Sequence, residues 1–412
     1  MESPKLIGAL TRLTRDVGAA EDLAQDALVA ALEQWPASGV PDNPGAWLMA
    51  TARRRAIDLF RRQSMVQRKH ELLGRELEDL QGDEPAGLDE AIDDDIGDDL
   101  LRLLFIACHP ILSPEARVAL TLRLLGGLTT AEIARAFLVP EPTIAQRIVR
   151  AKRTLAEEKI PFEVPRGTQR EARLASVLDS IYLIFNEGYS ATAGDDWIRP
   201  DLCEEALRVG RILAGLAPEE AEVHGLLALM ELHASRLRAR TDAKGEPILL
   251  LDQDRARWDR LLLQRGFASL ARAEALGGAN GRCALQAAIS ACHARALEAS
   301  ATDWPRIIGL YDALARESPS PIVDLNRAVA VAMAFGPEAG LAAVETIAEE
   351  PALRSYHLLP SVRGDMLFKL GRLDEARMEF ERAASLTQNE RERRLLLDRA
   401  AVARRERATG SA

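Results

Sequence analysis

The sequence predicts an all-α protein with more than one domain. Leucine and alanine recur at i, i+3 and i+4 along most of the chain, which is the spacing of amphipathic helices. Runs in which β-branched and polar residues alternate, as in half-buried strands, are absent from the sequence. The 412 residues are 47% hydrophobic and 28% charged, an ordinary globular composition in a chain long enough for two or three domains. We therefore expect helical domains in series and no sheet.

The first predicted domain, residues 1–62, contains two helices. One covers residues 20–35, and its acidic residues lie largely away from an apolar stripe. That stripe consists of Leu28, Leu32 and Trp35. Prolines then break the helix, and a second one over residues 45–62 carries five arginines with an aromatic residue near each end. Arginines beside aromatic residues suit a nucleic-acid strand with unstacked bases, and an exposed helix with its aromatic residues in the core is the alternative.

Residues 63–100 form the predicted linker between two domains. They contain 13 acidic and 3 basic residues, a net charge of -10, whereas residues 101–160 contain 9 basic and 5 acidic residues. A stretch of like charge repels itself, so we expect a flexible linker with at most transient helix. The whole chain also has a formal net charge of -10, which taken alone argues against nucleic-acid binding. Because the acidic excess lies mainly in the linker, this objection does not extend to the basic domain after it.

The domain over residues 101–160 contains a predicted helix-turn-helix. Thr129 and Glu132 form a capping box that begins a short helix, and a longer helix begins near Pro142. One face of the longer helix is polar and basic, with Gln146, Arg147, Arg150, Lys152 and Arg153. Such a helix fits the major groove of DNA, where its side chains meet base edges and phosphates. A plain helical bundle with a solvated basic helix is the alternative, and the agreement of cap, turn and charge favours DNA binding.

Residues 161–412 read as helix pairs separated by glycine and proline. Small and large residues alternate there in the spacing with which a tetratricopeptide repeat packs its two helices. The clearest unit consists of Gly364, Leu367, Gly371, Ala376, Phe380 and Ala383. We expect a C-terminal tetratricopeptide-like helical domain, with a poor fit to the repeat before about residue 280. Two prolines and a glycine over residues 161–170 predict a hinge in front of it.

The sequence offers no catalytic constellation, and we expect no enzyme, cofactor or metal. Phosphate-loop, zinc-protease and nucleophile-elbow motifs are absent. The four cysteines lie far apart, with no C-x-x-C pair, and are predicted to be reduced thiols in the core. No segment approaches the roughly 20 apolar residues that cross a membrane, and the first residues do not resemble a secretion signal. We therefore expect a cytoplasmic protein without membrane contact.

Three groups of motifs carry a family resemblance. The first comprises residues 20–26 (AEDLAQD), 47–48 (WL) and 56–58 (AID). The second comprises residues 112–115 (LSPE), 129–134 (TTAEIA) and 139–144 (VPEPTI). These resemble, in this order, regions 2 and 4 of bacterial RNA polymerase sigma factors of the extracytoplasmic-function group. Residues 182–189 (YLIFNEGY), 252–255 (DQDR) and 285–289 (LQAAI) resemble the subgroup with a fused tetratricopeptide-like C-terminal domain.

The resemblance implies a sigma factor that binds core RNA polymerase, at the β′ clamp and the β flap, and recognises promoter DNA. The residues it implies for polymerase binding are Asp22, Gln25 and Asp26. Those it implies for DNA binding are Arg53, Arg54, Arg55, Asp58, Arg61 and Arg62 in region 2, and Thr143, Gln146, Arg147, Arg150 and Arg153 in region 4. The C-terminal domain would serve regulation or bind a protein or peptide partner. The alternatives are a helix-turn-helix regulator that acts without polymerase and a helical scaffold with no DNA role.

Overall fold

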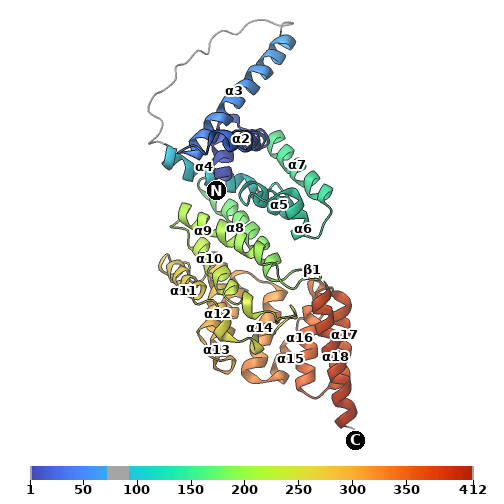
Figure 1. The fold of residues 1–412 in the computed structure, drawn as a ribbon. Helices are drawn as coiled ribbons and strands as arrows, with labels where there is room; N and C mark the ends of the chain where they lie inside the picture. The colour runs from blue at the N-terminus through green and yellow to red at the C-terminus, as the bar shows by residue number, and fades with distance from the viewer. Residues whose placement is uncertain (1, 72–91, 411–412) are drawn as a thin grey trace. The chain divides into compact units, whose positions relative to one another are not determined.

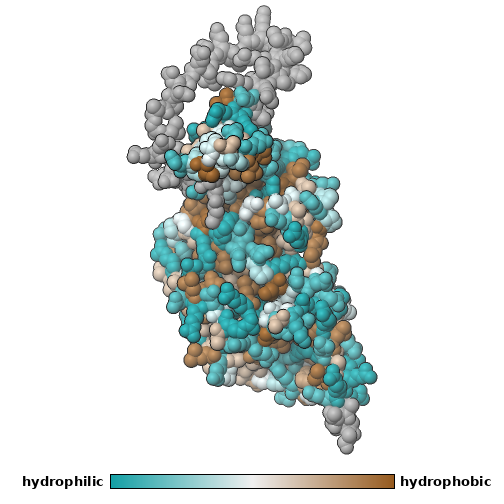
Figure 2. Space-filling view, viewed as in Figure 1, coloured by the Kyte–Doolittle hydropathy of each residue, from teal (hydrophilic) through white to brown (hydrophobic). Residues whose placement is uncertain are grey.

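The computed structural model describes residues 2–71 and 92–410, with side chains for residues 3–58, 99–167 and 169–407. Two compact units make up the chain: unit 1 extends to Ser180 and unit 2 begins at Ile181. Figure 1 shows that both units are built from helices, which confirms the all-α class. Within the described residues, the face seen in Figure 2 mixes hydrophilic and hydrophobic residues, and no helix is long and apolar enough to cross a membrane.

Unit 1 contains seven helices and the beginning of an eighth among the described residues. They are α1 (Glu2–Thr14), α2 (Val17–Ser38), α3 (Pro44–Glu71), α4 (Ile92–Ala107), α5 (Pro114–Leu124), α6 (Thr130–Ala136), α7 (Glu141–Glu157) and α8 (Thr168–Tyr189). The Asp16 carboxylate caps α2, because its Oδ1 accepts hydrogen bonds from the N–H groups of Gly18 at 2.7 Å and Ala19 at 3.1 Å. The predicted capping box is present on α6, where Thr129 and Glu132 bond each other's backbone N–H groups.

The apolar stripe predicted on α2 is wrong at Leu32. The buried face of this helix is lined mainly by small residues, including Ala20, Ala24 and Ala27, whereas Leu32 is 76% exposed. Alanines let neighbouring helices approach closely, so α2 packs mainly through its alanine face, together with the buried Leu23, and leaves Leu32 exposed.

Helices extend into both ends of the predicted linker. α3 continues to Glu71, and α4 begins at Ile92, so the expectation of at most transient helix fails at these ends; residues 72–91 lie outside the described residues. The physical reason at the second end is packing, because α4 carries buried leucines directly after Asp99. The Asp99 carboxylate is itself buried and is paired with Arg102 at 2.8 Å and with Arg12 at 3.5 Å.

The division between the units falls inside α8, later in the chain than the predicted hinge. Residues 161–167 are not helical, but the first turns of α8 pack back on unit 1. Arg173 donates a hydrogen bond from Nη2 to the carbonyl of Phe105 at 3.0 Å, and the Ser176 hydroxyl donates to the carbonyl of Cys108 at 2.5 Å. These bonds attach the start of α8 to the end of α4.

Unit 2 continues from α8 as a series of antiparallel helix pairs. Its further helices are α9 (Pro200–Leu216), α10 (Ala221–Ala234), α11 (Arg260–Ala275), α12 (Arg282–Arg295), α13 (Trp304–Glu317), α14 (Pro321–Phe335), α15 (Pro337–Glu345), α16 (Leu358–Lys369), α17 (Leu373–Leu386) and α18 (Glu390–Gly410). Short 3₁₀ helices are η1 (Leu237–Ala239), η2 (Leu250–Asp252), η3 (Arg255–Arg257), η4 (Ala299–Ala301) and η5 (Pro351–Leu353).

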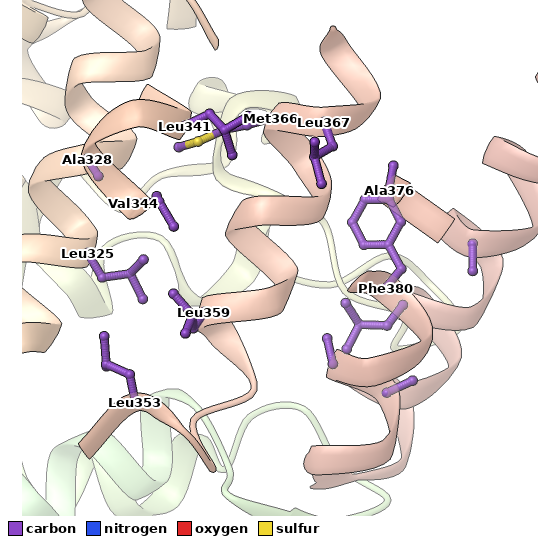
Figure 3. Packing of buried hydrophobic residues seen from close by; sticks show 14 residues of the cluster. Leu325, Ala328, Leu341, Val344, Leu353, Leu359, Met366, Leu367, Ala376 and Phe380 are labelled. Atoms are coloured by element: carbon purple, nitrogen blue, oxygen red, sulfur yellow. The ribbon is translucent and has the colours of Figure 1, made fainter. Parts of the chain in front are cut away.

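The predicted tetratricopeptide-like unit is present as α16 and α17. Figure 3 shows Phe380 of α17 in the core between these helices, and its side chain is fully buried. A Cβ atom built on Gly364 of α16 would lie 2.9 Å from the Phe380 ring, so only glycine allows this contact. Ala376 and Ala383 are fully buried on the same face of α17. The large and small residues therefore interlock as their spacing predicts.

A short parallel ladder in unit 2 is the exception to the expectation of no sheet. β1 (Ala193–Gly194) pairs with β2 (Gln388–Asn389), which follows α17 directly. Asn389 is completely buried and donates from Nδ2 to the carbonyls of Ala191 at 3.1 Å and Asp196 at 2.8 Å. The ladder thus joins the beginning of unit 2 to its last helix pair.

Candidate functional site

The three residues implied for polymerase binding lie on α2 and are all exposed. Asp22, Gln25 and Asp26 lie within two turns of one another, opposite the buried alanine face. Asp26 lies 3.4 Å from the guanidinium of Arg55 on α3, and Gln25 donates from Nε2 to the Glu21 carboxylate at 2.7 Å. This part of α2 therefore presents acidic and amide groups to solvent.

Glu21, the neighbour of these residues, connects α2 to the helix-turn-helix, and the sequence analysis did not single it out. Its side chain is buried, and its Oε1 accepts a hydrogen bond from Nε of Arg123 on α5 at 2.6 Å. The other carboxylate oxygen forms an ion pair with Lys152 on α7. Lys152 was predicted on the basic face of its helix, but it turns inward to this carboxylate. One buried acid thus joins region 2 to region 4 within unit 1.

We expect Glu21→Gln to loosen this junction, because it removes the charge that holds Arg123 and Lys152. Removing the acid of a buried ion pair leaves the cations without a counter-charge. Because both cations keep some contact with solvent, we expect the free energy of unfolding to fall by about 2 kcal/mol. Hydrogen exchange should become faster in α2, α5 and α7, while unit 2 serves as the internal reference. Glu33→Gln, on an exposed turn of the same helix, is the matched control and should leave exchange unchanged. Equal exchange in both variants would contradict the role given to Glu21.

The arginines implied for DNA binding in region 2 lie along α3. Arg53, Arg54 and Asp58 are exposed, and Arg55 is partly exposed beside Asp26. Arg61 and Arg62 continue the same helix, but their side chains lie outside the described residues. Leu48, Ala52 and Ala56 form the buried face of α3.

One of the aromatic residues on α3 belongs to the fold. The ring of Trp47 makes an edge contact with Trp35 of α2, with ring centroids 5.4 Å apart. Trp47 therefore helps to pack α3 on α2, as expected for the alternative in which the aromatic residues of this helix serve the core. Phe60, the other aromatic residue, lies outside the described side chains.

The polar face of α7 is open to solvent along the helix. Four of its residues are exposed and Arg147 is partly exposed; the exposed ones are Thr143, Gln146, Arg150 and Arg153. The opposite face is buried in unit 1 and consists of Ile144, Ile148, Ala151 and Leu155. The amphipathic pattern of the sequence therefore separates the residues that hold α7 from those that can meet a ligand.

A groove of about 480 Å³ lies between this polar face and the segment that begins α5 and contains Ser113 and Glu115. A second hollow, of about 320 Å³, lies on α7 itself and includes Val149 and Arg153. The pKa of Glu115 is lowered chiefly by hydrogen bonds from its own backbone N–H and from Ser113, and further by Arg147 and Arg117. The exposed face of α7 is thus a ridge of hydrogen-bonding and cationic groups.

In the pair Cys108 and His109, the cysteine belongs to the core and the histidine is partly exposed. Burial raises the pKa of the Cys108 thiol, and burial with the nearby Arg173 lowers the pKa of His109 to about 4. All four cysteines are free and buried, as predicted. Among the described residues, no three His, Cys, Asp or Glu side chains form a cluster that could hold a metal ion.

Comparison with protein families finds three matches along the chain. The family model for Sigma-70 region 2 matches residues 1–65, and the model for Sigma-70, region 4 matches residues 102–155. A family of unknown function (DUF6596) matches residues 173–274, which begin in α8 and end in α11.

Similar proteins cover either most of the chain or its first part. An uncharacterized protein of Rhizobium meliloti (strain 1021) is 45% identical over 388 residues, covering 94% of this chain and 90% of that protein. The ECF RNA polymerase sigma factor SigK of Mycobacterium ulcerans (strain Agy99) is 31% identical over 155 residues, covering 37% of this chain and 78% of that protein. SigK of Mycobacterium sp. (strain KMS) is 28% identical over 148 residues, or 35% and 72% of the two chains.

Among solved structures, yeast Tom70 matches 98% of this chain and 83% of its own at 11% identity, with a TM-score of 0.33, which supports no conclusion about function. The two region models match successive parts of unit 1, and the SigK proteins are similar to about a third of the chain. The chain is a member of the ECF RNA polymerase sigma factor family.

Proposed function

We propose that this protein directs core RNA polymerase to promoters through exposed surfaces of α2, α3 and α7 in unit 1 and that its C-terminal domain regulates this activity. The observation that carries the proposal is the exposed polar face of α7, which belongs to a helix-turn-helix whose other side is buried. A protein of this kind would act in the cytoplasm, with polymerase and DNA as its partners, and would not turn over a substrate.

In this proposal α7 enters the major groove at the minus-thirty-five element. Thr143, Gln146 and Arg147 lie in the first half of the helix, from which recognition helices contact base edges. Arg150 and Arg153 follow on the same exposed side, where guanidinium groups can bind phosphates. The groove between this ridge and the start of α5 leaves one side of the ridge accessible to a ligand.

The α3 helix would hold the melted strand of the minus-ten element. Arg53 and Arg54 are exposed side by side, and Asp58 lies about one turn further along the helix. Cationic side chains along a helix follow a single strand through its phosphates, while the bases remain free to be read. Arg61 and Arg62 extend the same series of charges along the helix.

The exposed acidic part of α2 would bind the β′ clamp of polymerase, and region 4 would contact the β flap. Asp22 and Asp26 offer negative charge, and Gln25 adds an amide between them. Complementary charge of this kind sets the orientation of a partner and speeds association.

Transcription from a promoter library with purified core polymerase tests the proposal. The full-length protein should give run-off products from a subset of promoters only when core polymerase is present, and it should co-purify with the polymerase. Specific binding to promoter DNA without polymerase, with no run-off product, would instead identify a regulator that acts alone.

The regulatory role of the C-terminal domain is tested by a truncation after Ser180. This end point keeps Arg173 and Ser176, whose hydrogen bonds attach α8 to unit 1. We expect the truncated protein to remain helical and to change run-off transcription several-fold in either direction. A truncation after Lys159, which removes those bonds, distinguishes loss of unit 1 packing from loss of the domain. Equal transcription by the full-length and Ser180 proteins, with and without cell extract, would show that the domain does not regulate initiation in cis.

A further inference from the structure

Three arginines inside unit 2 form a cluster that unit 1 and its proposed role do not explain. Arg236 and Arg240 follow the end of α10, and Arg255 begins η3; together they are called the arginine cluster below. Arg236 is buried, whereas Arg240 and Arg255 are partly exposed. The cluster therefore has a buried centre and two ends that reach the surface.

Two aromatic rings link the three guanidinium groups. The Arg236 Cζ atom lies 5.7 Å from the ring centre of Tyr189 and 5.6 Å from that of Trp258. Arg240 stacks on the same Tyr189 ring at 3.7 Å, and Arg255 stacks on Trp258 at 4.9 Å. Each outer arginine thus shares one ring with the buried Arg236, which brings three positive charges together.

No carboxylate balances these charges among the described residues. Elsewhere in unit 2, arginines near the core are paired with acids, as Arg199 is with Glu187 and Arg211 is with Glu231. In the cluster, Arg236 instead donates to the Tyr189 hydroxyl at 2.6 Å, and Arg255 donates to backbone carbonyls, including that of Ala296 at 2.7 Å.

The arginine cluster concentrates positive charge that is partly shielded from water. Burial lowers the pKa of Arg236 and of Arg255, and a neighbouring cluster arginine lowers each further. Burial, and then Arg236 and Arg255, lower the pKa of the adjacent His293 to about 4, so this side chain is neutral at pH 7. The buried charge of Arg236, which lies beside two further cations and has no counter-charge among the described residues, is therefore unfavourable.

Several hydrogen-bond donors of the cluster are also unused. Arg240 Nε, Arg255 Nη2 and the Trp258 indole N–H are buried and have no acceptor among the described residues. Buried polar groups in native proteins are nearly always satisfied, so three donors without a protein acceptor beside three cations favour an acceptor from outside the chain. Stacking on aromatic rings offsets part of the charge, but it supplies no acceptor for these donors.

We propose that the arginine cluster binds an oxyanion, the phosphate or carboxylate group of a small ligand. A guanidinium presents a planar pair of donors that matches both groups, and an indole N–H adds a further donor. The ligand enters from the partly exposed end at Arg240, where Trp197 lies 5.7 Å from the guanidinium and offers an aromatic face. The buried position of Arg236 limits the bound group to a small one. This site lies within the residues matched by the family of unknown function and does not depend on the sigma factor role.

Thermal unfolding of the full-length protein tests the site with inorganic phosphate and with citrate as probes. Each is compared with sodium chloride at the same ionic strength and pH. A ligand that binds only the folded state raises the unfolding temperature, and we expect a rise of at least about 2 °C at saturating probe. A rise with phosphate alone identifies a phosphate site, and a rise with citrate alone identifies a carboxylate site. No rise with either probe would overturn the proposal.

Matched variants locate the binding. Arg240→Gln removes one guanidinium at the partly exposed end, so it should fold and lose the probe-dependent rise. Arg238→Gln makes the same change at an exposed arginine in the neighbouring η1 and should retain the probe-dependent rise in unfolding temperature. Arg236→Gln removes the central charge. For this variant, the rise in unfolding temperature with the probe is measured relative to the unfolding temperature of the same variant in sodium chloride. An undiminished rise in Arg240→Gln would show that the anion binds elsewhere and that the cluster is held by stacking alone.

Discussion

Replacing Asp22 and Asp26 together by arginine is expected to abolish binding to core RNA polymerase. The two carboxylates are exposed on α2, and reversing both places positive charge against a partner surface that is proposed to be basic. Like charges brought together at an interface cost several kcal/mol, which corresponds to a loss of affinity of at least about 100-fold. The measurement is a pull-down with core polymerase at several concentrations of the double variant.

The fold should survive this change. The Asp26 carboxylate is 64% exposed, and its contact with Arg55 is a surface ion pair that contributes about 1 kcal/mol or less. A double variant with Glu33→Arg and Asp42→Arg changes the net charge equally at exposed positions of the same unit and should bind polymerase normally. If the Asp22 and Asp26 variant is folded by circular dichroism and still binds, this face of α2 is not the polymerase surface.

Replacing Arg147 by glutamate is expected to weaken promoter binding by roughly 10-fold to 100-fold, most strongly at low salt. The change removes a cation from the ridge of α7 and places a carboxylate across the groove from Glu115. A cation that neutralises DNA charge contributes about one to the slope of log K against log salt concentration, so a lower slope distinguishes the lost charge from a loss of folding. The measurement is a titration of promoter DNA with holoenzyme over a range of salt concentrations.

Two controls define the role of Arg147. Arg166→Glu makes the same charge change at an exposed position outside α7 and should leave affinity and slope nearly unchanged. Arg147→Lys keeps the charge, so it should retain the slope while losing any bidentate contact with a base. If Arg147→Glu behaves like Arg166→Glu, α7 does not dock on DNA through this residue.

The parts of the fold that could be predicted depend on contacts between residues close in sequence. The capping box of Thr129 and Glu132 spans four residues, so the sequence alone locates the start of α6. The contact of Gly364 with Phe380 joins two consecutive helices of a repeat whose spacing is visible in the sequence. For the same reason the two faces of α7 could be assigned from the spacing of its apolar residues.

The features that sequence analysis missed depend on contacts between distant residues. Glu21 and Arg123 are 102 residues apart, and nothing in the local pattern around either residue indicates that they meet. The inward turn of Lys152 follows from the same contact, since a helical pattern alone places it among the other basic residues. The arginine cluster was missed because its aromatic and cationic members come from separate helices and loops, and only packing brings them together.

The ladder between β1 and β2 also determines when unit 2 can be completed during synthesis. An open array of helical repeats can fold one repeat after another as the chain leaves the ribosome, because each repeat contacts only its neighbours. Here Asn389 bonds the carbonyl of Ala191, 198 residues earlier, so the start of unit 2 lacks this partner until nearly the whole protein has been made. Unit 1 has no such requirement and can be finished first. A ribosome that stops before β2 would therefore release a chain with complete sigma regions and an unclosed C-terminal domain.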